Sequence, residues 1–235
     1  MKLSIITCAY NEKDSILFVL DRVQAVNLGP DWEKEIIIVD NFSTDGTREL
    51  LQEVAQWGDP MVKVIFHPRN LGKGTSIRTG YAHATGKYAV IQDADFEYDP
   101  ADLKLLLDKA ESGGADAVFG SRTLGGQVAY KYVQNYVGNM FVTRVVNWLF
   151  GGRLTDAATA AKLVRTDIID SLKLKGTHFD LDFELPCKLF KHGYRIDEVP
   201  ISYRPRTAAE GKKIRPWDGL QALWVILKIR FFDRS

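Results

Sequence analysis

Short apolar runs alternate with amphipathic stretches along the first half of the chain. Apolar runs typical of strands occupy residues 3–10, 35–40, 62–68, 88–93 and 115–122. Stretches with the spacing and end signals of helices lie between or after them, at residues 14–26, 47–57, 72–84 and 100–113. This alternation predicts an α/β fold with a mainly parallel, doubly wound sheet flanked by helices.

Longer helical patterns dominate the second half of the chain, which starts at about Gly125. One late strand is expected within residues 194–206. No internal repeat or low-complexity linker separates the two halves. We therefore expect a single domain over residues 1–235, with a first half of about 1–124 and a C-terminal, largely helical elaboration of about 125–235.

Composition and the chain ends exclude several classes of protein. The net charge of +1 gives no reason to expect nucleic-acid binding. Cys8 and Cys187 stand alone in apolar surroundings, so we expect reduced core thiols and a cytoplasmic location. The N-terminus becomes polar too early for a signal peptide. No apolar run reaches the roughly 20 residues of a transmembrane helix.

Polar clusters follow the expected strands, where each strand leaves the sheet. They are "AYNE" (9–12), "DNFSTDGT" (40–47), "HPRNLGKG" (67–74), "DADFE" (93–97) and "GSR" (120–122). In open α/β sheets ligands bind outside the carboxyl ends of the strands. The coincidence of these clusters at one edge predicts a binding site there.

The pair Asp93 and Asp95 flanks the small residue Ala94. In an extended segment residues i and i+2 point the same way, so both carboxylates can approach one ion, and Glu97 adds a third oxygen donor. Mg²⁺ and Mn²⁺ take such ligands and commonly share them with phosphates. The alternative is a solvated acidic loop.

Several familiar motifs are absent. "NLGKGTS" lacks the upstream glycine of a P-loop, and Gly74 stands where a P-loop has Ser or Thr. No G-x-G-x-x-G follows the first strand, which argues against a dinucleotide-dependent dehydrogenase. The segment "RNLGKG" is therefore either a flexible turn before a helix or a basic loop beside phosphates.

The motifs "CAYNE", "DNFSTDGT", "RNLGKG", "DADFEYDP" and "GSR", in this order, resemble family two glycosyltransferases with the GT-A fold. The resemblance is closest to the polyprenyl-phosphate group, which includes dolichyl-phosphate mannose and glucose synthases. It extends through residues 154–162, 179–189 and 199–214. It implies a nucleotide-binding first half and an acceptor-side second half. The implied reaction is an inverting transfer, dependent on Mg²⁺ or Mn²⁺, from a nucleoside diphosphate sugar (GDP-mannose or a UDP-hexose) to a polyprenyl phosphate.

The resemblance also implies roles for individual residues. The residues it assigns to nucleotide binding are Ala9, Tyr10, Asn11, Glu12, Asp40, Asn70, Gly72, Lys73, Asp93 and Ala94. Asp95 is the implied metal ligand with Glu97 beside it, while Asp93 holds the ribose or reaches the metal through water. The family usually has Asp-Asp-Gly-Ser where this chain has residues 40–43, Asp-Asn-Phe-Ser, which leaves the base open. Asp40 could instead serve as a helix cap.

Several basic and acidic residues, most of them in the second half of the chain, bear on which acceptor receives the sugar. The residues implied to bind the acceptor phosphate are Arg122, Arg206, Lys212 and Lys213, whose alternative role is a solvated basic surface. In relatives with hydroxyl acceptors a carboxylate near Asp182 and Glu184 acts as base, whereas an ionised phosphate needs none. A transferase acting on a saccharide or small-molecule hydroxyl, with one of these two as base, remains an alternative. A non-catalytic module that binds nucleotide sugars is another.

The C-terminal segment contains apolar residues at roughly helical spacing. They are Trp217, Leu220, Leu223, Trp224, Leu227 and Phe231, with Lys228 and Arg230 beside them. This stripe either packs on the sheet or lies in a membrane interface. Because a polyprenyl phosphate stays in the bilayer, the resemblance implies peripheral contact with the cytoplasmic face of a membrane.

Overall fold

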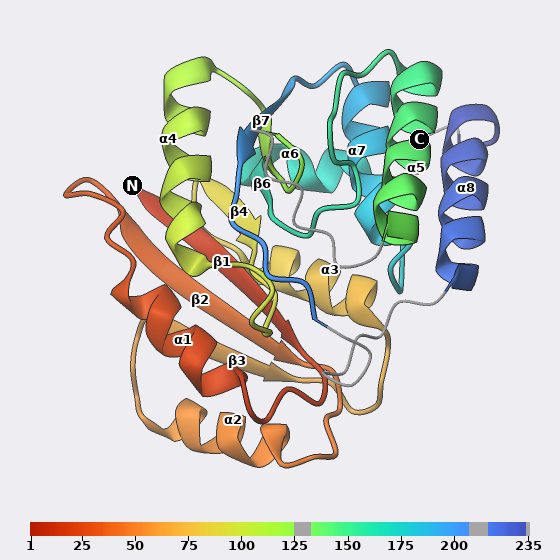
Figure 1. Ribbon diagram of the computed structural model, residues 1–235. Helices are drawn as coiled ribbons and strands as arrows, with labels where there is room; N and C mark the ends of the chain where they lie inside the picture. Colours follow the sequence, from red (N-terminus) through yellow and green to blue (C-terminus); the bar gives the residue numbers. More distant parts are fainter. Residues whose placement is uncertain (125–132, 207–215, 234–235) are drawn as a thin grey trace.

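A seven-stranded sheet crosses the molecule (Figure 1). The computed structural model describes residues 1–124, 133–206 and 216–233. The strands are β1 (Lys2–Ala9), β2 (Glu33–Asp40), β3 (Val62–Phe66), β4 (Tyr88–Ile91), β5 (Ala117–Ser121), β6 (Lys162–Arg165) and β7 (Ile196–Pro200). Their order is β3-β2-β1-β4-β6-β5-β7, and β6 runs antiparallel to β4 and β5 while the other pairs are parallel. The predicted α/β class with a mainly parallel sheet is confirmed.

Helices cover both faces of the sheet. They are α1 (Ile16–Ala25), α2 (Thr47–Gln56), α3 (Lys73–His83), α4 (Leu103–Gly113), α5 (Val133–Phe150), α6 (Thr166–Ile169), α7 (Leu181–Lys191) and α8 (Pro216–Phe231). Two short 3-10 turns, η1 (Pro100–Asp102) and η2 (Asp170–Leu172), complete the described helical elements.

The core is divided by the sheet into two layers, because successive strand residues point to opposite faces. Ile5 belongs to the cluster that packs on α1, α2 and α4, whereas its neighbour Ile6 belongs to the cluster that packs on α3, α5, α7 and α8. Val118 and Phe119 divide in the same way in β5. Strands buried on both faces explain why the sequence has continuous apolar runs instead of alternation.

Helix α8 packs through a different face from the one that the sequence suggested. Its buried residues are Ala222, Ile226 and Ile229, which lie against α5 and α7. Of the apolar stripe picked out from the sequence, Leu220, Trp224, Leu227 and Phe231 are exposed and Leu223 is half-buried, while the Trp217 side chain lies outside the described part. Of the two alternatives for this stripe, packing on the sheet is therefore wrong. None of the helices that the structure describes is long and apolar enough to cross a bilayer.

Helix α3 approaches the sheet closely at Gly80. A Cβ atom built there would lie 2.3 Å from Cγ2 of Ile6, the stiff β-branched side chain of β1 beneath it. Gly138, in the middle of α5, has no atom within 4 Å of such a Cβ. A side chain at Gly80 would therefore clash with the sheet, whereas a side chain at Gly138 has open space.

We expect Gly80→Ala to destabilise the protein by about 1–3 kcal/mol, because the added methyl overpacks the contact with Ile6. Gly138→Ala is the matched control and should stabilise by up to about 1 kcal/mol through helix propensity alone. Urea denaturation of both variants measures the two changes. Equal shifts of the same sign would contradict the close approach of α3 to β1.

Candidate active site

The carboxyl ends of the parallel strands β1, β2 and β4 bring the polar clusters of the sequence together. A cavity of about 350 Å³ lies at this edge, and a larger one of about 840 Å³ adjoins it. Residues that line both cavities are Glu12, Asp95, Glu97, Tyr98, Tyr203 and Arg206. The two cavities therefore share one charged wall.

Most of the residues expected to bind a nucleotide line the smaller cavity. They are Ala9, Tyr10, Glu12, Asn70, Gly72, Lys73, Asp93 and Ala94, and Asn11 lines the larger cavity. Asp40 lines neither. Its fully buried carboxylate accepts a hydrogen bond from the Ser43 amide and pairs with Arg48 at 2.7 Å, which gives it a structural role at the end of β2.

The segment "RNLGKG" is held in one conformation at the cavity rim. The Asn41 side chain accepts a hydrogen bond from the Leu71 amide at 2.8 Å and donates one to Asn70 at 2.9 Å. Gly72 has a φ of +88°, and a Cβ there would lie 2.2 Å from the Thr177 carbonyl oxygen. These contacts favour an ordered loop over a flexible turn. Asn41, which departs from the family pattern, is thus a residue that orders the loop.

Lys73 begins α3 beneath this loop and pairs with Asp93, with 2.9 Å between Nζ and Oδ1. Burial alone would lower the pKa of the Lys73 amine, but the carboxylates of Asp93 and Asp182 outweigh burial and raise it. Lys73 therefore stays charged in the cavity wall. It is a cation placed to approach a bound phosphate.

Asp95 and Arg206 form the centre of the shared wall. The Arg206 guanidinium pairs with the buried carboxylate of Asp95 and, at 3.1 Å, with Glu12. The Arg206 amide also donates to Glu97, at 2.7 Å. Burial and the neighbouring charge of Asp93 raise the pKa of the Asp95 carboxyl, and Arg206 opposes that rise. The contacts bring together three segments that are remote in the sequence.

The carboxylates of the shared wall are suitable ligands for a hard divalent cation, although the described residues do not surround a single position as a complete set of metal ligands would. Among the residues that the structure describes, no three His, Cys, Asp or Glu side chains are clustered as a metal site. Asp95 and Glu97 supply carboxylate oxygens, the donors that Mg²⁺ and Mn²⁺ prefer. Both carboxylates line the cavity. An ion at Asp95 would replace the contact that Arg206 makes there.

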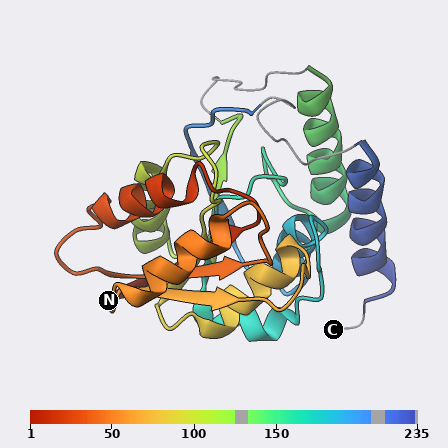
Figure 2. The same cartoon turned by 90° about the horizontal axis from the view of Figure 1, so that it is seen from below.

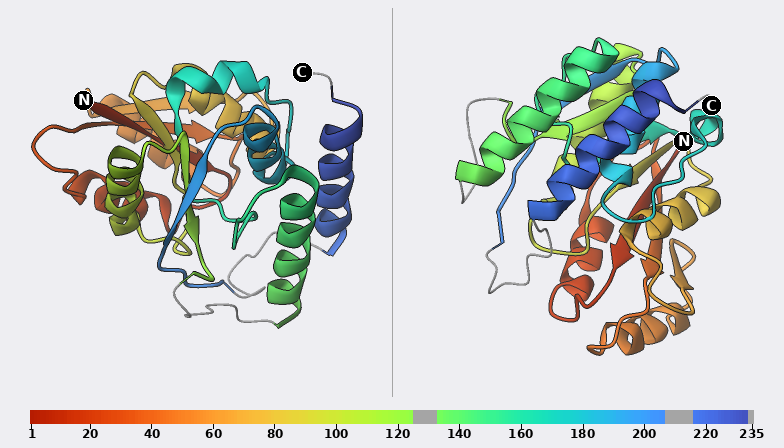
Figure 3. Two further views of the ribbon diagram at one scale, coloured as in Figure 1. Left: turned by 90° about the horizontal axis from the view of Figure 1, so that it is seen from above. Right: turned by 90° about the vertical axis from the view of Figure 1, so that its right-hand side faces the viewer.

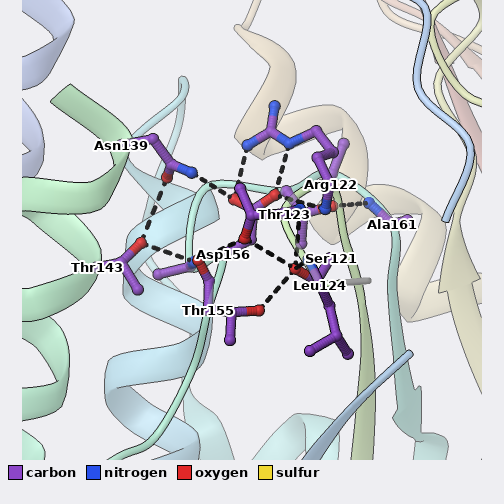
Figure 4. Close-up of polar contacts among 12 residues, drawn as sticks. Ser121, Arg122, Thr123, Leu124, Asn139, Thr143, Thr155, Asp156 and Ala161 are labelled. Atoms are coloured by element: carbon purple, nitrogen blue, oxygen red, sulfur yellow. Dashed lines mark hydrogen bonds and ion pairs between the residues drawn. The ribbon is translucent and has the colours of Figure 1, made fainter. Parts of the chain in front are cut away.

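Arg122 lines the smaller cavity at the end of β5. Its guanidinium is held by the carboxylate of Asp156 (Figure 4). Its Nε and Nη2 donate to the two oxygens of Asp156 at 2.6 and 2.7 Å, in a fork geometry. Asn139 of α5 donates to the same carboxylate at 2.9 Å, and Glu198 of β7 accepts hydrogen bonds from the Asp156 and Thr155 amides. Asp156 therefore fixes the direction of the Arg122 side chain.

The charge of Arg122 also determines the ionisation of Asp156. Burial would raise the pKa of this fully buried carboxyl, but the Arg122 guanidinium outweighs burial and lowers it. Sequence reasoning missed Asp156. It lies in the segment 154–162 that carries part of the family resemblance, but nothing in that segment indicates a partner more than thirty positions away.

The two acidic candidates of α7 have different surroundings. Asp182 lines the smaller cavity and is buried, and its Oδ1 has no hydrogen-bond partner. The Nζ of fully buried Lys162 lies 3.9 Å from this oxygen. Burial lowers the pKa of Lys162 to about 8, against the opposing effect of Asp182. Asp182 is thus a carboxylate with unused hydrogen-bonding capacity at the cavity wall.

Glu184 lies outside both cavities. Its carboxylate accepts hydrogen bonds from the amides of Lys175 and Gly176, the latter at 2.6 Å, and pairs with Lys188 at 3.2 Å. These contacts favour a structural role in holding the loop before α7. Lys212 and Lys213, the other expected phosphate ligands, lie outside the described residues.

Comparisons with known proteins agree with the geometry. A family model described as glycosyl transferase family 2 matches residues 4–172. The low-salt glycan biosynthesis hexosyltransferase Agl6 of Haloferax volcanii is 27% identical over 87% of this chain and 48% of its own. The undecaprenyl-phosphate 4-deoxy-4-formamido-L-arabinose transferase of Salmonella paratyphi A is 25% identical over 90% of this chain and 62% of its own. The chain thus spans about half of the first relative and less than two thirds of the second.

Solved structures show the same fold at low sequence identity. The glucosyl-3-phosphoglycerate synthase of Mycobacterium tuberculosis matches with a TM-score of 0.72 and 18% identity, over 100% of this chain and 82% of its own. Other structures of that synthase contain UDP with Mn²⁺ or with Mg²⁺. The mannosyltransferase PcManGT of Pyrobaculum calidifontis, in complex with GDP-Man and Mn²⁺, matches with a TM-score of 0.63 and 18% identity, over 98% of this chain and 70% of its own. The GT-A fold implied by the sequence is confirmed.

We expect Asp156→Asn to destabilise the protein by about 3 kcal/mol or more at neutral pH, because it leaves the buried Arg122 without its counter-charge. The pKa of Asp156 is lowered in the folded state, so its contribution is complete above an unfolded pKa of about 4 and is lost as the pH falls through the folded value. The difference from the unaltered protein should therefore shrink on acidification.

Urea denaturation at several pH values measures that difference. Asp108→Asn, which breaks the exposed pair with Lys104, is the control and should cost less than about 1 kcal/mol at every pH. A pH-independent loss in Asp156→Asn would show that the carboxylate charge does not matter to the fold.

Proposed function

Because the chain belongs to glycosyl transferase family 2, we propose that it transfers a sugar from a nucleoside diphosphate sugar to the phosphate of a polyprenol. The observation that carries this proposal is the shared wall, where Asp95 meets Arg206 between two cavities. Carboxylates suit the metal that accompanies a donor diphosphate, and arginines suit an acceptor phosphate. The reaction would invert the anomeric centre, because the acceptor attacks in one displacement.

The donor would occupy the smaller cavity. Its walls supply the backbone of Ala9 and Tyr10, the ordered loop at Gly72 and the cation of Lys73. GDP-mannose and a UDP-hexose both remain candidates, since Asn41 and Phe42 replace the family residues after Asp40. The complexes of structural relatives with UDP and with GDP-Man support a nucleotide sugar as the donor.

A divalent ion, Mg²⁺ or Mn²⁺, would be held by Asp95 with Glu97 and, directly or through water, Asp93. When bound, such an ion neutralises the charge that grows on the departing diphosphate. The metal-containing structures of relatives support this cofactor. Arg206, released from Asp95, would remain within reach of a phosphate in the same wall.

The acceptor would approach between Arg122 and Arg206. Arg122 already has Nε and Nη2 committed to Asp156, so its orientation is set before a phosphate arrives. A pre-oriented guanidinium binds an anion without losing much side-chain freedom. The undecaprenyl-phosphate transferase among the relatives supports a lipid phosphate as acceptor.

We expect Asp95→Asn to lower sugar transfer by about a hundredfold or more, because it removes the carboxylate proposed to hold the metal. It should also weaken Mn²⁺ binding, followed by electron paramagnetic resonance of the free ion in the presence of UDP or GDP. Asp21→Asn, on the exposed face of α1, is the control and should change neither quantity. Near-normal turnover of Asp95→Asn in the presence of a chelator would refute the metal assignment.

A second candidate function is transfer to a hydroxyl group. Oδ1 of Asp182 favours it, since this oxygen makes no hydrogen bond in the cavity wall and is available to accept one from an acceptor hydroxyl. The first candidate needs no such base, because a phosphate is already ionised. Transfer to a hydroxyl thus requires Asp182 as a base, whereas transfer to a phosphate does not.

Asp182→Asn distinguishes the two candidates. With a polyprenyl phosphate as acceptor we expect less than about a tenfold loss in kcat and an unchanged pH profile, whereas a hydroxyl acceptor would require a loss of about 100-fold or more. The measurement is transfer from UDP- and GDP-sugars to a panel of polyprenyl phosphates and free saccharides. Asp170→Asn, an exposed position, serves as the control.

A further inference from the structure

Two neighbouring helices each expose an apolar stripe. On α5 the exposed apolar residues are Val133, Val137, Phe141 and Trp148, and on α8 they are Leu220, Trp224, Leu227 and Phe231. Both series recur at intervals of three, four or seven residues, which places each on one face of its helix. Trp148 is 81% exposed and Trp224 63% exposed, unusually high values for such large side chains.

The opposite faces of these helices are already used. Val142 and Val146 of α5, with Ala222, Ile226 and Ile229 of α8, lie in the core cluster. Figures 2 and 3 show α5 and α8 side by side along one end of the molecule. Their exposed stripes are thus additional to the packing of the fold, and together we call them the α5–α8 face.

The charges around the α5–α8 face are predominantly positive. Helix α5 contains Arg144 and no acidic residue, and α8 contains Lys228 and Arg230 against the single acid Asp218. Arg144, Lys228 and Arg230 are all exposed. Exposed tryptophans with basic neighbours suit the interface of an anionic membrane, where the rings enter the headgroup level and the cations meet lipid phosphates.

The same charges argue against a second copy of this chain as the partner. A two-fold dimer through this face would bring the patch against itself, so that Arg144, Lys228 and Arg230 of both copies would meet like charges. An anionic surface has the opposite sign. The positive charge of the α5–α8 face is therefore complementary to an anionic bilayer and not to a second copy of the same face.

Chain connectivity links the face to the candidate active site. Residues 123–132 join Arg122 to the start of α5, and residues 207–215 join Arg206 to the start of α8. Each cavity arginine thus stands 10 or 11 positions before one of the helices that carry the face.

We infer that the α5–α8 face docks this protein on the surface of an anionic lipid bilayer. The inference deepens the proposed function. The purpose we assign to docking, which is to present the cavity arginines to a lipid phosphate, rests on that function. Docking itself requires only lipid headgroups and no acceptor. The helices lie on the surface, since no described helix is suited to span the membrane.

The test uses vesicles without any polyprenyl phosphate, composed of phosphatidylcholine alone or with about 30% phosphatidylglycerol. We expect the protein to float with the anionic vesicles at low salt and the double variant Trp148→Ser, Trp224→Ser to bind at least about tenfold more weakly. Trp57→Ser is the matched control, because Trp57 is 58% exposed at the end of α2, outside the face. It should bind as the unaltered protein does.

Charge reversal tests the second half of the argument. The double variant Lys228→Glu, Arg230→Glu should lose at least about tenfold in binding to anionic vesicles, and salt should weaken the binding of the unaltered protein. Lys63→Glu with Lys104→Glu reverses two cations on β3 and α4 and should have a much smaller effect. Equal losses in both pairs would overturn the inference, since only net charge would then matter.

Two further outcomes would also overturn it. One is the absence of vesicle binding at low salt. The other is a dimer, seen by light scattering, that dissociates in the tryptophan double variant while lipid binding is unchanged.

Transfer to a short, water-soluble polyprenyl phosphate should persist in the tryptophan double variant. If this transfer fails in the unaltered protein although vesicles bind, the proposed function is wrong and the docking face stands.

Discussion

A buried carboxylate requires a cation, and this constraint organises the carboxyl edge of the sheet. The pairs that satisfy it are Asp40 with Arg48, Asp95 with Arg206 and Asp156 with Arg122, and half-buried Asp93 pairs with Lys73 in the same way. Each carboxylate lies at a strand end or in a loop, and each cation comes from another element. The pairs therefore join α2, α3 and the segments after β5 and β7 to one edge, where hydrophobic burial alone would not fix their positions.

Paired charges also prepare the site for charged ligands. A donor diphosphate with its metal carries both signs, and so can exchange partners with Asp95 and Arg206 without leaving either charge unpaired. A phosphate without a metal can satisfy only Arg206, and a neutral sugar has no charge to offer either partner. The proposed preference for a metal–diphosphate pair therefore rests on the Asp95–Arg206 pair, since the wall as a whole, with Glu12 and Glu97, has an excess of carboxylates. Asp156 and Asn139 take no part in the exchange and keep Arg122 in place throughout.

The sequence was sufficient to predict the parallel half of the sheet, because five apolar runs alternate with helical patterns there. It did not predict β6, whose four residues begin with a lysine and end with an arginine and lack any strand pattern. Nor could it separate Asp182 from Glu184, which stand two positions apart. In a helix such residues point in widely different directions, so one reaches the cavity and the other the loop behind it. Long-range pairs such as Arg122 with Asp156 leave no local signal.

The position of β6 has a consequence for how the molecule folds. Strand β5 pairs with β6 and β7 among the described strands, and β6 alone joins it to β4. The first half of the chain therefore contains a strand with no partner of its own, and cannot complete its sheet until residues 162–165 have been inserted. Such non-local pairing implies slow closure of the sheet, because β5 gains its connection to β4 only when residues far along the chain have docked.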